Sequence, residues 1–307
     1  MAAILLLSGF YVIPNLERNT LLAGFTPEFM GRPDGYIGLR QTYGLNVPTV
    51  VINDAVMYKA IYERKLDVVS GYGTDGRIAA YGLVSLEDDK NIFPPYYAAP
   101  ILKEQTLERF PELESVLNLL AGRINDSVMT ALNYQADYLH RSPAAIAREF
   151  LDQQGLYRLP QPPGENTITV GSKVFDEQYI LASMYTQLIR GYTDLDVLPK
   201  TGLGGTKICF DALMNDQIDL YPEYTGTGLT VMLQADPKTL SRLTADKDAL
   251  YDYVQEAFQQ QYGVKWLKPI GFNNTYALMM RKEDVNRMGI RTISDLSDYL
   301  IANNDGT

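Results

Sequence analysis

The chain has 307 residues, of which 46% are hydrophobic and 21% are charged, and this composition is typical of a folded protein with two domains. Its net charge of −10 argues against nucleic acid and anionic membrane surfaces as partners, because both bind clustered lysine and arginine. A single cysteine, Cys209, and a single histidine, His140, exclude an internal disulfide and a Cys/His zinc site. We expect no metal site and no cofactor.

Tyrosine is the unusual residue of this composition, with 22 copies against 10 phenylalanines and 1 tryptophan. A tyrosine side chain combines an aromatic face with a hydroxyl tip, which suits a polar pocket with aromatic walls. The alternative is that most of these tyrosines are ordinary surface or core residues.

Residues 1–20 begin with an apolar run from Ala2 to Ile13. This run is shorter than a membrane span, and the basic start of a secretory signal is missing. Three interpretations stay open for it: a leader, a remnant of a membrane segment, or a packed strand.

From residue 21 onward, apolar strands alternate with amphipathic helices, which predicts an α/β fold. In the first half, strands are expected at 21–25, at 47–52 and from 66, and helices at 55–64, 111–122, 126–132 and 143–154. The last of these helices has Ser142 as its expected N-cap, Pro143 at its first position and Gly155 past its end.

Residues 155–166 contain three prolines and two glycines without periodicity, and we place a linker at 158–166. The α/β pattern then restarts, with strands expected at 167–170, 196–198, 264–267 and 277–280 and helices at 176–190, up to 215, at 248–262 and at the end of the chain. Thr292 and Asp295 form a capping box for the last helix.

Two loops after expected strands are candidates for ligand contact. The glycine-rich turn at 201–206 precedes a helix as an anion cradle would, but it has neither the spacing of a dinucleotide-binding motif nor the lysine of a P-loop. The stretch 218–228 runs from an apolar strand into tyrosines, threonines and turn-forming glycines. Open α/β sheets bind ligands at such strand ends.

Six segments together resemble the glycine betaine/choline/carnitine-binding proteins of ABC importers. They are 32–36 (RPDGY), 74–76 (TDG), 93–97 (FPPYY), 171–178 (GSKVFDEQ), 221–227 (YPEYTGT) and 271–276 (GFNNTY). The resemblance extends over nearly everything from residue 21 to residue 307.

The order of the segments departs from that family, in which the Gly-Ser-Lys segment comes first and the Pro-Pro-Tyr-Tyr segment near the end. We interpret the chain as similar to a circular permutant, in which residues 304–307 would continue into 21–25 and the linker would join the old ends. The rival interpretation is a fragment of two tandem binding domains, which would complete itself by exchange with a second copy.

The resemblance implies the bilobed type II periplasmic-binding-protein fold, with two α/β lobes joined by a two-strand hinge and a ligand between them. Lobe I is expected to comprise residues 76–157 and 167–275. Lobe II is expected to comprise residues 21–75 and 276–307, while 1–20 stays outside both lobes.

The resemblance further implies an aromatic cage for a quaternary ammonium group, built by Tyr72, Tyr96, Tyr224 and Tyr276. A trimethylammonium group has no N–H to donate, so aromatic faces must hold it, each contributing roughly 0.5–2 kcal/mol. Ordinary packing is the alternative for each ring.

By the same resemblance, a ligand carboxylate would meet Arg32, Lys173 and Thr227. An ion pair with Asp34 is the alternative for Arg32. The remaining implied contacts are polar residues of the same motifs: Gln178, Asn274 and Asp75, the last serving either the cage or the hinge.

The expected function is a non-catalytic solute receptor that binds glycine betaine, choline or carnitine and delivers it to the membrane permease of an ABC importer. We expect it outside the cytoplasm, either periplasmic or associated with the outer membrane face, and as a monomer, with an exchange dimer as the alternative. Two other functions stay open: an α/β enzyme using Asp219 and Glu223 as an acid/base pair, and an engineered or signalling sensor on the same scaffold.

Overall fold

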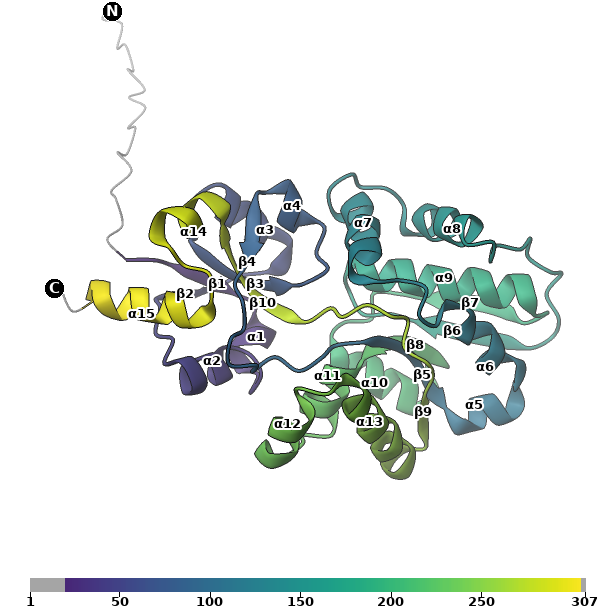
Figure 1. Cartoon of the computed structure of the whole chain (residues 1–307). Helices are drawn as coiled ribbons and strands as arrows, with labels where there is room; N and C mark the ends of the chain where they lie inside the picture. Colours follow the sequence, from purple (N-terminus) through teal and green to yellow (C-terminus); the bar gives the residue numbers. More distant parts are fainter. Residues whose placement is uncertain (1–19, 305–307) are drawn as a thin grey trace, which may run out of the picture.

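The chain forms two α/β lobes that lie next to each other, each built on a five-stranded sheet (Figure 1). This arrangement comes from a computed structural model that describes residues 20–304. The two-lobe fold expected from the resemblance is therefore confirmed. The apolar run between Ala2 and Ile13 lies outside the described residues.

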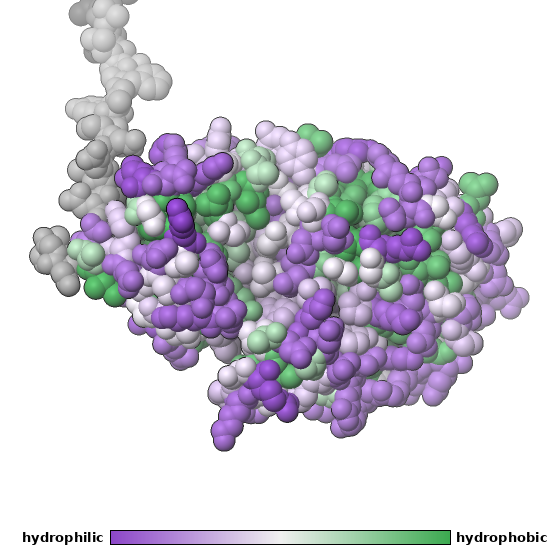
Figure 2. Space-filling view, viewed as in Figure 1, coloured by the Kyte–Doolittle hydropathy of each residue, from purple (hydrophilic) through white to green (hydrophobic). Residues whose placement is uncertain are grey.

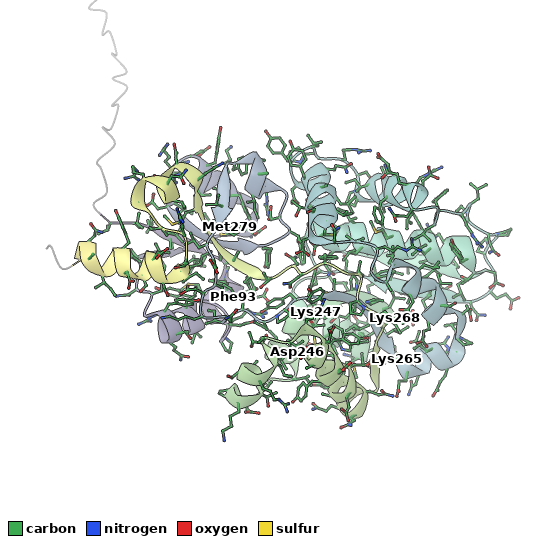
Figure 3. All side chains as sticks on the ribbon, in the orientation of Figure 1. Phe93, Asp246, Lys247, Lys265, Lys268 and Met279 are labelled. Carbon is green, nitrogen blue, oxygen red and sulfur yellow. The ribbon has the colours of Figure 1, made fainter. Side chains whose placement is uncertain are left out.

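Lobe II contains the first sheet, with strand order β2-β1-β3-β10-β4. Its strands are β1 (Ala23–Phe25), β2 (Thr49–Val51), β3 (Val68–Tyr72), β4 (Leu83–Ser85) and β10 (Tyr276–Arg281). Its helices are α1 (Pro27–Gly31), α2 (Tyr36–Tyr43), α3 (Asp54–Tyr62), α4 (Arg77–Ala80), α14 (Lys282–Met288) and α15 (Ile293–Asn304). Figure 3 shows Met279 of β10 within this lobe.

Lobe I contains the second sheet, with strand order β7-β6-β8-β5-β9. Its strands are β5 (Ala98–Lys103), β6 (Thr167–Gly171), β7 (Asp196–Lys200), β8 (Leu220–Tyr224) and β9 (Val264–Trp266). Its helices are α5 (Glu104–Arg109), α6 (Glu112–Leu117), α7 (Asp126–Asp137), α8 (Pro143–Gln153), α9 (Asp176–Tyr192), α10 (Thr206–Met214), α11 (Thr225–Thr227), α12 (Pro237–Leu243) and α13 (Lys247–Tyr262), with a 3-10 turn at Asn118–Leu120 and a π-helical turn at Gly228–Met232.

The two sheets share one topology. In each, the first three strands of the order are parallel, and the strand that enters from the other lobe, β10 or β5, is antiparallel to both of its neighbours. Two crossover segments, 86–97 and 267–275, connect the lobes, and they pair with each other at Tyr97 and Asn273. This pairing is the two-strand hinge of the type II architecture.

The lobe boundary differs from the one expected at residue 75. Strand β4 pairs with β10, so α4 and β4 extend lobe II as far as Ser85. Segment 267–275, expected in lobe I, is instead the second crossover. The reason is that β10 needs a partner on its outer side, and the chain supplies β4 before it leaves for lobe I.

Helix α9 is the center of lobe I. The stripe predicted for it is buried, with Leu181 and Met184 fully inaccessible, and the helix packs against α6, α7 and α8. The linker at 158–166 forms no helix or strand, and its backbone is bonded to this lobe through Gln161 N to Arg190 O and Gly164 N to Asp194 O. The linker is therefore held along the lobe surface.

Most of the expected helices and strands are present, and the residues at the helix ends test the predicted caps. The capping box is confirmed, because Thr292 N donates to Asp295 and Asp295 N donates to Thr292 Oγ1. Ser142 is the N-cap residue as predicted, although its side chain makes no capping hydrogen bond. Helix α7 runs beyond residue 132 to Asp137.

The glycines at the end of β8 serve close packing and do not form a tight loop. Residues 225–232 are helical, contrary to the loop expected there. A Cβ on Gly226 would lie 2.7 Å from the Tyr96 ring, and one on Gly228 would lie 2.9 Å from the Trp266 ring. The first crossover can therefore approach α11 closely only because Gly226 has no side chain.

The outer surface is mixed, with polar side chains over most of the visible face of both lobes and apolar residues in separate groups (Figure 2). Within residues 20–304, none of the helices combines the length and the apolar character that crossing a membrane requires.

Gly76 sits where lobe II touches α7 of lobe I, which allows a test of the lobe contact. A Cβ there would lie 2.2 Å from the backbone nitrogen of Tyr134, and a backbone atom cannot rotate away. The φ of Gly76, −65°, suits alanine, so only the contact changes. We expect Gly76→Ala to hold the lobes apart and to increase the radius of gyration measured by small-angle X-ray scattering.

Gly31→Ala is the control for this measurement, because nothing lies within 4 Å of the Cβ that it adds. An unchanged radius of gyration in Gly76→Ala would contradict a rigid contact between the two lobes at this point.

Candidate functional site

A cavity of about 380 Å³ lies between the lobes, and residues from both lobes and both crossovers line it. All four predicted tyrosines, Tyr72, Tyr96, Tyr224 and Tyr276, are among its lining residues. We call it the aromatic cavity.

Strand ends and pairing explain why tyrosines so distant in sequence meet. Tyr72 ends β3 and Tyr276 begins β10, and the two are directly opposite each other in the antiparallel pair. Tyr224 ends β8 opposite Ala98, the first residue of β5, so Tyr96 on the incoming crossover arrives beside it. Tyr72, Tyr224 and Tyr276 are thus placed by the register of paired strands, and Tyr96 lies on the crossover just before β5.

The rings face one another at angles that leave a space with several aromatic walls. The ring centroids of Tyr96 and Tyr276 are 5.6 Å apart with an interplanar angle of 87°, and those of Tyr72 and Tyr276 are 5.1 Å apart. Phe175 adds a fifth ring, nearly parallel to Tyr72 at 6.2 Å and to Tyr224 at 6.3 Å. Sequence reasoning missed Phe175 as a site residue, although its place in the 171–178 motif was a usable signal.

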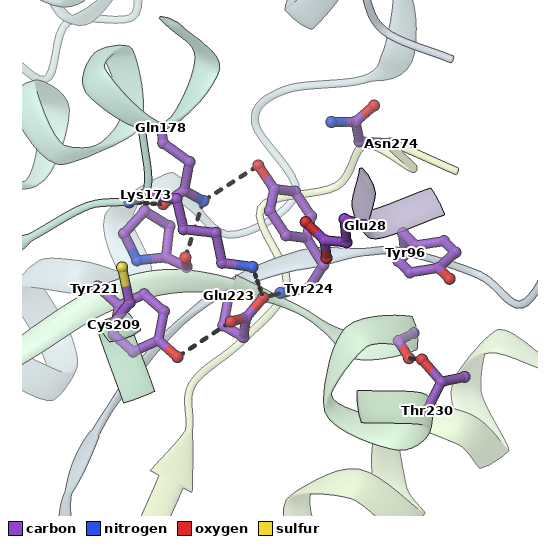
Figure 4. Close-up of polar contacts among 12 residues, drawn as sticks. Glu28, Tyr96, Lys173, Gln178, Cys209, Tyr221, Glu223, Tyr224, Thr230 and Asn274 are labelled. Carbon is purple, nitrogen blue, oxygen red and sulfur yellow. Dashed lines mark hydrogen bonds and ion pairs between the residues drawn. The ribbon is translucent and has the colours of Figure 1, made fainter. Parts of the chain in front are cut away.

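The hydroxyl of Tyr224 is fixed on both sides. It donates to Glu177 Oε1 at 2.7 Å and accepts from Gln178 Nε2 at 3.1 Å, and Figure 4 shows the bond from Gln178. Burial raises the pKa of Tyr224 well above its ordinary value, so the hydroxyl keeps its proton. Gln178 itself does not line the aromatic cavity, and it positions Tyr224 from behind.

Glu177 is a buried carboxyl group to which four side chains donate. Thr74 of lobe II, Asn133 and Tyr224 of lobe I, and Asn274 of the second crossover all donate to it, at 2.7 to 2.9 Å. Burial raises its pKa, which the four hydrogen bonds oppose. Glu177 therefore joins both lobes and the hinge, a role that the sequence did not reveal.

Arg32 does not line the aromatic cavity. Its Nε and Nη2 donate to both carboxylate oxygens of Asp34 at 2.8 and 2.7 Å, the ion pair weighed as the alternative from sequence. It also crosses between the lobes, donating to the Tyr96 hydroxyl and to Thr230 Oγ1, each at 3.0 Å. The guanidinium is thus engaged by protein groups, and Arg32 links lobe II to lobe I.

Lys173 lines the aromatic cavity, and its ammonium is 2.5 Å from Glu223 Oε1 (Figure 4). Tyr221 donates to the other oxygen of Glu223 at 3.1 Å. Asp219, the second carboxylate of the enzyme hypothesis, accepts from Thr169 N at 2.7 Å, and neither acid lines the cavity. The proposed acid/base pair therefore has no place at this site.

Thr227 and Asn274 line the aromatic cavity as expected. The glycine-rich turn also reaches it, through Gly204, Gly205 and the start of α10 at Thr206. A helix N-terminus presents partial positive charge, so this end of the cavity differs in polarity from its aromatic walls.

Asp75 lies at a second, smaller cavity of about 250 Å³, also between the lobes. We call it the acidic cavity, because five carboxyl groups line it: Asp54, Asp75, Asp137, Asp176 and Glu177. Asp75 accepts from Arg77 at 2.9 and 2.6 Å. Burial, together with the charge of Asp75 and a hydrogen bond with Asp176, raises the pKa of Asp137 to about 8. Within residues 20–304, no cluster of three or more His, Cys, Asp and Glu is arranged to hold a metal ion.

Comparison with known proteins matches two long parts of the chain. A family model described as the substrate binding domain of an ABC-type glycine betaine transport system matches residues 13–153 and 166–307. The carnitine transport binding protein OpuCC of Listeria monocytogenes is 36% identical over 141 residues, covering 45% of this chain and 46% of that protein. The glycine-betaine-binding protein of Pseudomonas aeruginosa is 34% identical over 141 residues, covering 45% of each.

Two further similarities involve a transport protein and a solved structure. An ergothioneine transport permease/binding protein of Helicobacter pylori is 32% identical over 130 residues, covering 42% of this chain and 24% of that protein. A crystal structure of a glycine betaine/carnitine/choline ABC transporter is 38% identical, covers 45% of this chain and 52% of that one, and superposes with a TM-score of 0.37. The chain therefore spans slightly less than half of the length of the Listeria and Pseudomonas proteins.

The raised pKa of Asp137 predicts a pH dependence of stability. An acid whose pKa rises on folding favours the folded state below its unfolded pKa, and this contribution is lost as the pH rises towards about 8. Burial is the main cause of the raised pKa, Asp75 and Asp176 add to it, and the positive charge of Arg77 opposes it. We expect Asp137→Asn to gain stability relative to wild type from about pH 5 to about pH 8, as measured by urea denaturation.

Asp152→Asn is the matched control, because Asp152 is an exposed carboxylate on α8 of the same lobe. If both variants show the same trend with pH, the effect comes from net charge and not from the acidic cavity.

Proposed function

This chain belongs to the family of substrate-binding domains of ABC-type glycine betaine transport systems, and we propose that it binds a quaternary ammonium solute between its two lobes. The observation that carries the proposal is the convergence of Tyr72, Tyr96, Tyr224 and Tyr276 on one cavity. These rings come from lobe II, a crossover and lobe I, so a ligand among them contacts both lobes at once.

The physics of the cavity suits a cation without N–H groups. Each aromatic face attracts such a cation by roughly 0.5–2 kcal/mol when water is excluded. Burial raises the pKa of Tyr72, Tyr96 and Tyr224 well above the ordinary value, so these phenols stay neutral and attract through their ring faces. Phe175 adds a face without a polar tip.

The polar end of the cavity suits the carboxylate of a betaine or carnitine. Lys173, Thr227 and the start of α10 at Thr206 offer positive charge or a hydroxyl in the lining, which also contains the carboxyl groups of Glu28 and Asp54. Because Glu223 already neutralises Lys173, its attraction for a carboxylate is moderate. Glycine betaine, carnitine and choline are the proposed ligands, and ergothioneine joins them because of the relative named for it.

We further propose that the closed protein presents its ligand to an ABC permease on the extracytoplasmic side of a membrane. The two crossovers and the lobe contacts at Glu177 and Arg32 support closure by hinge motion. A single chain completes both sheets, which favours a monomer and a circular permutant over exchange between two copies. The role is non-catalytic, in keeping with a family of transport proteins.

Truncation of a cage ring tests the proposal. We expect glycine betaine, carnitine and choline to bind with one-to-one stoichiometry in isothermal titration calorimetry, and Tyr224→Ala to weaken all of them at least about tenfold, because one buried ring contributes on the order of 1.4 kcal/mol. Tyr62→Ala, at an exposed tyrosine of α3, is the control and should leave the affinities unchanged. The proposal is abandoned if none of these ligands binds.

Arg32→Ala tests whether the Arg32 side chain holds the two lobes together or binds the carboxylate of the ligand. Because Asp34, Tyr96 and Thr230 already engage the guanidinium, we expect its loss to weaken the lobe contact and to reduce glycine betaine and choline affinity by similar factors. The same calorimetric titration measures the affinities for glycine betaine and for choline. A loss confined to glycine betaine would instead mean that Arg32 turns to meet the ligand carboxylate.

A further inference from the structure

Helix α7 extends from the hinge to the outer edge of the contact between the lobes. Its first residue, Asp126, accepts from Asn273 N of the second crossover at 2.7 Å. Tyr138 is the C-cap at the other end of the helix, about 18 Å from Asp126 at a rise of 1.5 Å per residue. Figure 1 shows α7 next to α4 of lobe II. A contact at Tyr138 is therefore far from the hinge, and opening of the lobes separates it more than a contact near Asp126.

Four tyrosines form a row of ring contacts across the lobe boundary, and we call them the aromatic row. Tyr62 and Tyr81 belong to lobe II, and their ring centroids are 5.0 Å apart. Tyr134 and Tyr138 belong to lobe I, and their ring centroids are 5.1 Å apart. The rings of Tyr81 and Tyr138 connect the two pairs, at 6.2 Å and an interplanar angle of 82°. This edge-to-face arrangement is one that aromatic pairs prefer.

The aromatic row is separate from the ligand cavity. Neither Tyr81 nor Tyr138 lines the aromatic cavity or the acidic cavity. Tyr62 is 58% exposed and Tyr138 is 44% exposed, so the row lies at the surface of the molecule. A ligand between the lobes does not meet these rings. Any effect of the row on ligand binding must therefore act through the relative position of the lobes.

Each of the two rings that meet across the boundary is supported within its own lobe. Tyr62 packs against Tyr81 in lobe II. Tyr134 lies one helical turn before Tyr138 and stacks on it with an interplanar angle of 22°. Side chains that are already oriented lose little further freedom when they make a contact. The contact between Tyr81 and Tyr138 is thus prepared in both lobes before they close.

Three contacts between lobe II and α7 follow one another along the helix. Asn133 Nδ2 donates to Thr74 O at 2.8 Å, and the backbone of Tyr134 lies against Gly76. The ring contact of Tyr138 with Tyr81 comes next and is the outermost of the three. Because these contacts join two different lobes, all three depend on closure.

We propose that Tyr81 and Tyr138 form a latch, which favours the closed arrangement of the lobes and thereby raises the affinity for every ligand of the aromatic cavity. Both are positioning residues, because they touch no ligand. The inference rests on the hinge closure proposed above and does not depend on which ligand binds. A protein whose binding-competent state is only partly populated binds with an affinity reduced by that fraction. A latch that increases the closed population therefore strengthens binding of all ligands by one common factor.

A double-mutant cycle measures the latch through ligand affinity. We expect Tyr138→Ala to weaken glycine betaine, carnitine and choline by one common factor of about threefold to tenfold in isothermal titration calorimetry. Tyr81→Ala is expected to give a similar loss, and the double variant no further loss, because both changes remove the same contact. Tyr138→Phe keeps the ring and should retain the affinity. Leu139→Ala, at the exposed apolar residue next to Tyr138, is the control and should leave it unchanged. Losses that add in the double variant, or an equal loss in Leu139→Ala, overturn the proposal.

The closed fraction is measured directly by single-molecule energy transfer between dyes on the two lobes. Lys59→Cys on α3 and Asp152→Cys on α8 place the dyes at exposed positions, while the buried Cys209 stays unlabelled. We expect Tyr138→Ala to lower the closed fraction without ligand and at the glycine betaine concentration that half-saturates the wild-type protein. Tyr224→Ala changes the cage and should leave the ligand-free closed fraction unchanged.

The two measurements separate failure of the latch from failure of the proposed function. If no ligand binds to the wild-type protein, the proposed function fails, and the ligand-free closed fraction alone decides: a lower value in Tyr138→Ala supports the latch and an equal value overturns it. A loss of affinity with an unchanged closed fraction means damage to the cage and also overturns the latch. Tyr81→Ala is measured in the same way and covers the case in which Tyr138→Ala folds poorly.

Discussion

The buried carboxyl group of Glu177 is the constraint on which the rest of the site depends. It accepts from Thr74, Asn133, Tyr224 and Asn274, which belong to lobe II, to two elements of lobe I and to the hinge. A buried acceptor that lost any of these donors would be left undersatisfied, at a cost of about 1–3 kcal/mol. The lobe arrangement, the direction of the Tyr224 hydroxyl and the position of the second crossover are therefore set together.

Glu177 lines the acidic cavity, which adjoins the aromatic cavity through shared residues. Six residues line both spaces: Asn53, Asp54, Tyr72, Val174, Phe175 and Asn274. The aromatic cavity combines its rings with Lys173, which is paired with Glu223, and with the carboxyl groups of Glu28 and Asp54. Its aromatic walls suit a cation that donates no hydrogen bond, because ring faces attract positive charge without accepting from an N–H.

Arg32 shows how the burial of charge shapes this site. A guanidinium in a buried place needs partners, and the chain supplies Asp34 two residues away, with Tyr96 and Thr230 across the cleft. The Tyr96 hydroxyl in turn donates to Asp34, so the ion pair and one wall of the aromatic cavity hold each other in place. The buried charge of Arg32 is therefore used for contact between the lobes.

The sequence by itself determined the α/β character, most helices and strands and the linker, because hydrophobic periodicity and turn residues are local properties. It also pointed to the four tyrosines that line the aromatic cavity, because the short motifs that contain them resemble those of a known family. It could not place the lobe boundary at Ser85, because the need of β10 for an outer partner is a property of the sheet. Nor could it find the role of Glu177 or decide between two partners for Arg32. Those depend on which side chains meet across the cleft, and the register of two sheets and the path of two crossovers, fixed only on folding, decide that.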